Sequence, residues 1–104
     1  MTRNDGQCPV TETMTVIGGK WKPIILWILR DHVRRFGEIK RFIPAITQKM
    51  LTQQLRELEE NKIINRKVYP VVPPKVEYSL SEYGRTLIPI LDAMAAWGGK
   101  HKNL

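Results

Sequence analysis

Residues 47–62, TQKMLTQQLRELEENK, place hydrogen-bonding side chains along one face of a predicted helix. Apolar positions recur at i, i+4 and i+7, which predicts a buried seam formed by Leu51, Leu55 and Leu58. At about 100° per residue, the roughly opposite face carries Lys49, Thr52, Gln53 and Arg56. The three longest of these side chains suit base edges and phosphate groups. Since one helix fits a major groove about 12 Å wide, the pattern predicts a DNA-recognition helix.

The two ends of this predicted helix carry further polar residues. Thr47 is a good N-cap, and Thr47 and Gln48 lie where exposed backbone N–H groups favour a phosphate. Glu57, Glu59 and Glu60 are unfavourable beside DNA, so we expect that half to diverge from the groove. Glu57 can instead pair with a neighbouring basic group. The alternative interpretation is that the polar face is merely solvated.

The chain after this helix changes to the period of β-strands. Residues 64–69 and 75–80 are rich in β-branched and aromatic residues, and the prolines between them cannot donate to a sheet. A hairpin straight after a recognition helix is a wing. We expect its basic side chains to reach phosphates beside the groove: Arg66, Lys67 and Lys75.

The chain before the recognition helix supplies the rest of a helix-turn-helix. Pro9 can begin a helix that ends near Ile17 before two glycines, and an almost entirely apolar helix over 21–30 is the predicted core helix. A short strand over 33–36 and a short helix over 36–43, stopped by proline, follow. We therefore predict an α+β, mainly α fold: a winged helix-turn-helix with a three-helix core, a β-hairpin wing, and additional N- and C-terminal helices.

Ser81 can cap a final helix that is apolar over about half of its circumference. This is wider than the ~100° stripe that packing on one core requires, so the surplus predicts a second subunit. We expect Pro89 to kink this helix. The predicted homodimer contacts are Leu87, Ile90, Leu91, Met94 and Trp97.

Cys8 directly precedes Pro9, which predicts that it lies at a helix N-cap, where the helix dipole stabilises a thiolate. It is the candidate sensor of electrophiles or oxidants, and an inert cysteine tucked beneath the first helix is the alternative. His32, His101 and Cys8 are far apart in sequence, so no metal site is expected. Neither a phosphate-binding loop nor a paired acid and base with a nucleophile is found, so we expect no cofactor and no enzyme.

Composition bounds these predictions. The 104 residues fit one domain, and residues 1–7 are expected to be disordered. A net charge of +7, with a pI near 9.9, favours a polyanionic partner. No apolar run approaches the ~20 residues needed to span a bilayer, so no membrane partner is expected. A single cysteine, with no signal-peptide pattern, fits a cytoplasmic protein.

Several motifs, in order, resemble the HxlR-type winged helix-turn-helix regulators of bacteria: CPV at 8–10, IGGKW at 17–21, RF at 35–36, ITQKMLTQQLRELE at 46–59, VPPKVEY at 72–78 and AWG at 96–98. The resemblance covers residues 8–99. It implies a MarR-like homodimer, joined through its N- and C-terminal helices, that binds double-stranded operator DNA. Members mostly repress transcription, and some sense electrophiles or oxidants through one N-terminal cysteine. The sequence does not indicate which small molecule acts as an effector.

We therefore predict a transcriptional regulator, a repressor in preference to an activator, that binds a pseudo-palindromic operator. Two other classes of function stay open. A winged-helix module that binds another protein would show no salt-dependent affinity for duplex DNA. An electrophile-scavenging or redox enzyme centred on Cys8 would show turnover, although the sequence supplies no recognisable base near that cysteine.

Overall fold

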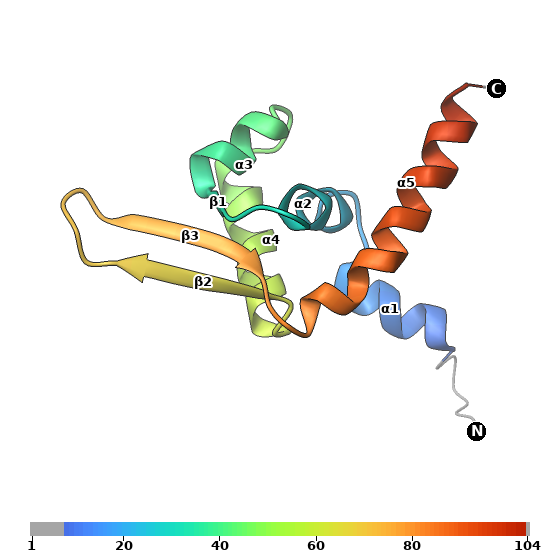
Figure 1. The fold of residues 1–104 in the computed structure, drawn as a ribbon, viewed down its shortest axis with the longest axis horizontal. Coiled ribbons are helices and arrows are strands. Elements are labelled where there is room, and N and C mark those ends of the chain that lie inside the picture. The colour runs from blue at the N-terminus through green and yellow to red at the C-terminus, as the bar shows by residue number, and fades with distance from the viewer. Residues whose placement is uncertain (1–7, 104) are drawn as a thin grey trace.

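The computed structural model describes residues 8–103 as a helical body with a β-hairpin extending from it (Figure 1). In chain order the elements are α1 (Pro9–Ile17), α2 (Lys22–Leu29), β1 (Arg34–Arg35), α3 (Phe36–Phe42), α4 (Gln48–Glu60), β2 (Ile64–Tyr69), β3 (Lys75–Leu80), the 3-10 helix η1 (Gly84–Leu87) and α5 (Ile88–Lys102). The hairpin points away from one side of the body, and α1 and α5 project from the other (Figure 1). This is a winged helix-turn-helix, which confirms the predicted fold class. The predicted disorder of residues 1–7 lies outside the described residues.

The core forms where α2, α3 and α4 meet. The leucine seam of α4 is fully buried, as predicted, and it shares one apolar cluster with the inner side of α2, whose buried residues are Ile25, Leu26 and Leu29. Ile39 of α3 completes the helical part of that cluster. The outer side of α2 differs from the prediction, because Ile24 is exposed and Trp27 is only partly buried.

Local signals set both ends of α4. The Thr47 hydroxyl accepts a hydrogen bond from the Met50 N–H at 3.0 Å, which confirms the predicted N-cap. At the C-terminus, Lys62 has a left-handed backbone (φ 65°) and its N–H donates to Glu59 O, while the Ile63 N–H donates to Leu58 O. This pair of bonds is a Schellman motif, which satisfies carbonyl groups that the helix leaves free. It also turns the chain directly into β2.

The sheet has three antiparallel strands in the order β1-β3-β2. The hairpin strands have the predicted bounds, and their register pairs Ile64 with Leu80 and Tyr69 with Lys75. The predicted strand over 33–36 shortens to two residues, because Phe36 already begins α3. That short strand ties the helix-turn-helix to the wing, since Arg35 pairs with Glu77 of β3.

The approach to α5 corrects two details. The predicted kink at Pro89 is wrong. Pro89 lies in the first turn of α5, where a backbone N–H has no partner within the helix, so proline costs no hydrogen bond there. Ser81 caps the turn before η1 rather than a long helix, because its hydroxyl accepts from the Gly84 N–H and donates to Lys62 O. Within residues 8–103, the helices are too short or too polar to cross a membrane.

Gly84 leads to a stability prediction, because a Cβ at this position would lie 2.0 Å from Ile63 O. Gly84→Ala must therefore displace backbone at the junction of α4 and β2, and we expect it to lower the free energy of unfolding by roughly 1–3 kcal/mol. The measurement is urea unfolding followed by circular dichroism.

Gly37→Ala is the matched control, since a Cβ there meets only the end of the Arg41 side chain at 3.9 Å. We expect this helical substitution to leave stability unchanged or raise it by up to about 1 kcal/mol. Equal unfolding midpoints for Gly84→Ala and the unsubstituted protein would show that the close approach carries no energetic weight.

Candidate nucleic-acid interface

The face of α4 opposite the leucine seam is open to solvent. Every predicted recognition residue on this helix and at its cap is exposed: Thr47, Gln48, Lys49, Thr52, Gln53 and Arg56. Most of them line one hollow along the helix, together with Glu57 and Glu60. The structure thus brings the predicted α4 residues together on one surface.

Two threonines on this surface already use part of their hydrogen-bonding capacity. Thr47 Oγ1 accepts the capping bond, so its hydroxyl proton remains available to a phosphate. Thr52 Oγ1 donates to Gln48 O at 2.9 Å, which commits its proton inside the helix. Thr52 can therefore offer its methyl group and an acceptor, a combination that suits the methyl group of thymine.

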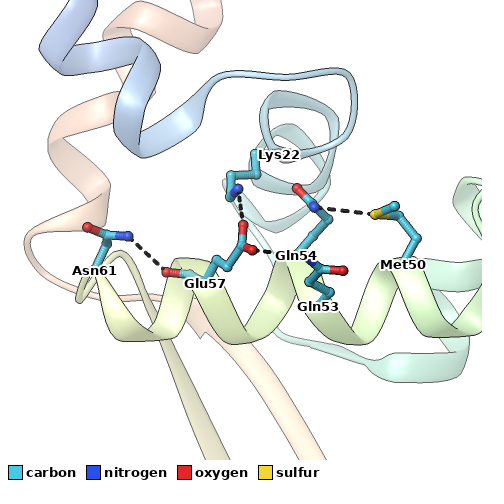
Figure 2. A network of polar contacts seen from close by, with 6 residues as sticks. All are labelled: Lys22, Met50, Gln53, Gln54, Glu57 and Asn61. Atoms are coloured by element: carbon cyan, nitrogen blue, oxygen red, sulfur yellow. Dashed lines mark hydrogen bonds and ion pairs between the residues drawn. The ribbon is translucent and has the colours of Figure 1, made fainter.

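Glu57 is paired, as predicted, and its partner is Lys22 of α2. Lys22 Nζ lies 2.5 Å from Glu57 Oε1, and the Gln53 amide nitrogen donates to Glu57 Oε2 at 3.2 Å (Figure 2). The Lys22 ammonium first, and then the Gln53 amide, hold the pKa of Glu57 below its ordinary value. The carboxylate therefore stays ionised at neutral pH. Sequence reasoning missed Lys22, because 35 positions separate the pair.

The outer face of the wing carries a cluster of cations around one tyrosine. Lys67 Nζ and Lys75 Nζ lie 5.0 and 4.5 Å from the centre of the Tyr69 ring. The Tyr69 hydroxyl donates to Glu77 Oε1 at 2.9 Å, and Lys75 Nζ lies 3.6 Å from Glu77 Oε2. The tyrosine hydroxyl, followed by Lys75, lowers the pKa of Glu77. These contacts hold the two lysines on one face.

The third predicted wing cation lies elsewhere. Successive side chains of a strand alternate between faces, and Arg66 is opposite the buried Tyr78, so it lies on the other face of the hairpin from Lys67, although its own side chain is exposed. Arg35, which sequence reasoning missed, lies across from Glu77 on the outer face. The outer face therefore combines Arg35 with Lys67 and Lys75. The alternation of β2 could have separated Arg66 from the sequence alone.

Cys8 occupies the N-cap of α1, as predicted, and its thiol is exposed rather than tucked beneath the helix. Its Sγ accepts from the Thr11 N–H at 3.3 Å and lies 3.0 Å from Thr11 Oγ1. The Thr11 hydroxyl first, and then the Thr11 N–H, lower the pKa of the thiol. A lowered pKa raises the thiolate fraction, which is the reactive form.

The predicted dimer residues divide into exposed and buried groups. Ile90, Met94 and Trp97 are exposed on α5, and Trp97 is 68% exposed. Leu91 instead lies in the core of its own protomer at 2% exposed, and Leu87 packs partly against that core. An apolar groove of about 290 Å³ lies between α2 and α5. It is lined by Pro23, Ile24, Trp27, Leu91, Met94 and Ala95.

The two histidines are exposed and far from Cys8 in the chain. His32 pairs with the neighbouring Asp31, and His101 stacks on Trp97 with ring centres 4.9 Å apart. Over residues 8–103, the histidine, cysteine and acidic side chains form no group of three that could hold a metal ion.

Comparison with known proteins gives concordant matches. A family model described as HxlR-like helix-turn-helix matches residues 16–104. The chain is 62% identical over 94 residues to the HTH-type transcriptional regulator YtcD of Bacillus subtilis (strain 168), covering 90% of this chain and 75% of that protein. It is 56% identical over 96 residues to YdeP of the same organism, with 92% and 75% covered. The solved structure of the redox regulator HypR in its oxidized form matches with a TM-score of 0.87 and 57% identity, over 89% of this chain and 96% of that one.

The environment of Cys8 predicts a measurable effect of Thr11→Val. This change removes the hydroxyl that contributes most to the lowered thiol pKa and keeps the backbone N–H, so the pKa should rise toward its ordinary value. The rate of alkylation by iodoacetamide, measured against pH, reports the midpoint. Thr13→Val is the control, because its hydroxyl bonds to Pro9 O instead. Identical midpoints in all three proteins would contradict this account.

Proposed function

Because this chain belongs to the HxlR-like helix-turn-helix family of transcriptional regulators, we propose that it binds pseudo-palindromic operator DNA as a homodimer and represses transcription. The observation that supports this most strongly is the exposed polar face of α4 beside a basic wing. In this proposal α4 enters the major groove, where Lys49, Gln53 and Arg56 meet base edges. Lys67 and Lys75 rest on the phosphate backbone.

Homodimerisation is supported by apolar surface that one protomer leaves uncovered. Val10 and Met14 of α1 are exposed, as are Ile90, Met94 and Trp97 of α5. Both helices project from the side of the body opposite the wing (Figure 1). Exposed apolar surface rimmed by polar residues is typical of an interface. A two-fold axis there would present two copies of α4 to successive major grooves, about 34–36 Å apart.

Redox control through Cys8 is the regulatory part of the proposal. It is supported by the exposed thiol with its lowered pKa and by the likeness to a protein described as a redox regulator. Oxidation or alkylation would remove the negative charge of the thiolate and so weaken the bond that Sγ accepts from the Thr11 N–H at the start of α1. The modification would therefore act first on one of the two helices that carry the exposed apolar surface.

Two substitutions test the DNA-binding roles, and mobility-shift titrations at several salt concentrations are the measurement. Gln53→Ala should reduce discrimination between operator and unrelated duplex by about 1–3 kcal/mol, since Gln53 is assigned to a base edge. Lys75→Ala should weaken binding to all duplexes and lower the salt slope by ~1, since Lys75 is assigned to a phosphate.

Lys102→Ala is the charge-matched control, because it removes one cation from the end of α5 remote from the wing (Figure 1). It should leave base discrimination unchanged. If the unsubstituted protein showed no salt-dependent affinity for duplex DNA, the alternative of a protein-binding winged-helix module would replace this proposal.

Trp97→Glu tests the dimer. A charge at the most exposed tryptophan position should raise the dimer dissociation constant by about thirtyfold or more, as loss of a central aromatic contact does. Sedimentation equilibrium measures this constant. Val72→Glu is the control, because Val72 is fully exposed in the wing loop. A dimer of unchanged affinity in the Trp97 variant would place the interface on another surface.

A further inference from the structure

The amide of Gln53, a predicted base-reading residue, is linked through Glu57 to a second helix. The tie runs from Lys22 of α2 to Glu57 and from Glu57 back one turn of α4 to Gln53 (Figure 2). Each Glu57 oxygen serves one partner: Oε1 accepts from Lys22, and Oε2 accepts from Gln53. The glutamate is therefore held from both sides.

Lys22 fixes the position of the carboxylate. Its side chain is only 12% exposed, while that of Glu57 is 37% exposed, so the ammonium is held between the helices. Lys22 is the first residue of α2, whose inner side is part of the core. The place of Glu57 Oε1 is thus set by the packing of α2 on α4, and a charge-assisted bond of this kind is stronger than a neutral one.

The bond to Glu57 determines which way the Gln53 amide faces. A carboxylate can only accept, so the NH₂ end must point to Glu57, whichever way the amide would otherwise turn. One N–H is committed by this bond. The carbonyl oxygen and the second N–H make no hydrogen bond within residues 8–103, and the Gln53 side chain is exposed, so both groups remain available to a partner.

This remaining pair matches one base. Adenine presents an acceptor at N7 and a donor at N6 in the major groove, and a glutamine amide meets both through one N–H and its carbonyl oxygen. We propose that Lys22 and Glu57 are positioning residues that set the Gln53 amide to read adenine of an A·T pair. This inference rests on the proposed function and adds the identity of one operator base.

The ion pair has a second consequence for a DNA-facing surface. Glu57 lines the same hollow as Lys49 and Arg56, where a free carboxylate would repel phosphates and could accept from the N4 amino group of cytosine. Lys22 compensates its charge and occupies one of its oxygens. The pair therefore removes a competing base preference while it orients Gln53.

The test is a selection of duplexes by the full chain. The probe is a pool randomised over about 20 base pairs, enough for two half-sites one helical turn apart. Bound duplexes are sequenced for the unsubstituted protein, Gln53→Ala, Lys22→Met, Glu57→Gln and the double variant of Lys22→Met with Gln53→Ala. Lys20→Met and Glu59→Gln are the controls, since they make the same charge changes at exposed positions, one in the loop between α1 and α2 and one in α4.

Gln53→Ala should lower the A·T preference by about tenfold at one symmetric pair of positions. Lys22→Met should lower the preference at those same positions by about three- to tenfold, and should have no further effect in the Gln53→Ala background. Glu57→Gln should replace A·T by G·C there. The new amide must give its oxygen to Lys22 and its NH₂ to Gln53, which turns the Gln53 NH₂ toward the two acceptors of guanine.

Other outcomes overturn the inference. If Lys22→Met weakened binding to all duplexes alike and kept the A·T preference, the pair would be only a structural tie. A retained A·T preference in Glu57→Gln, or in Gln53→Ala, would also overturn it. Thermal unfolding by circular dichroism identifies a variant that fails to fold, and Glu57→Gln, which keeps size and shape, then decides. If the unsubstituted protein enriched no motif, the proposed function would fail, and this inference with it.

Discussion

Burial of the leucine seam of α4 determines which side chains that helix can offer to a partner. Leu51, Leu55 and Leu58 are all enclosed by the core that α2 and α3 provide. Turning α4 about its axis would expose them, at a cost of roughly 1.5–3 kcal/mol for each leucine. The sum is comparable with the whole stability of a small domain, about 5–15 kcal/mol. The polar face is thus held outward by the apolar face, and every role assigned to Gln53 or Arg56 depends on this.

Local features of the sequence predicted most of the fold. The Thr47 cap, the prolines of the wing loop and the change of period after Asn61 each act within a few residues, so the bounds of α4, β2 and β3 follow from them. Pro89 was misjudged because proline is tolerated in the first turn of a helix, and the start of α5 depends on the preceding 3-10 turn. The period and order of the elements predicted the winged helix-turn-helix, and the family resemblance added the expectation of a MarR-like homodimer.

The sequence predicted the parts of the candidate site that lie within one helix or strand, but not the contacts between elements. The exposed face of α4 follows from its own period, but Lys22 reaches Glu57 from another helix. Arg35 joins the wing lysines only because β1 pairs with β3. These contacts also change the charge of the surface. Glu57 and Glu77 each form an ion pair with a neighbouring lysine. These two carboxylates would therefore repel a polyanion less than free carboxylates would.

One junction connects α4, the wing and the approach to α5. The Schellman turn at Lys62 leads α4 into β2, and Ser81 bonds through its hydroxyl to Lys62 O and through its N–H to Ile63 O. Gly84 then passes so close to Ile63 O that a side chain has no room. Because these bonds span the end of α4 and the start of η1, they fix the point at which the chain enters η1 relative to α4 and the wing. The exposed apolar residues of α5, where we propose the dimer contact, and the exposed polar face of α4, where we propose the DNA contact, are therefore positioned relative to one another through this one junction.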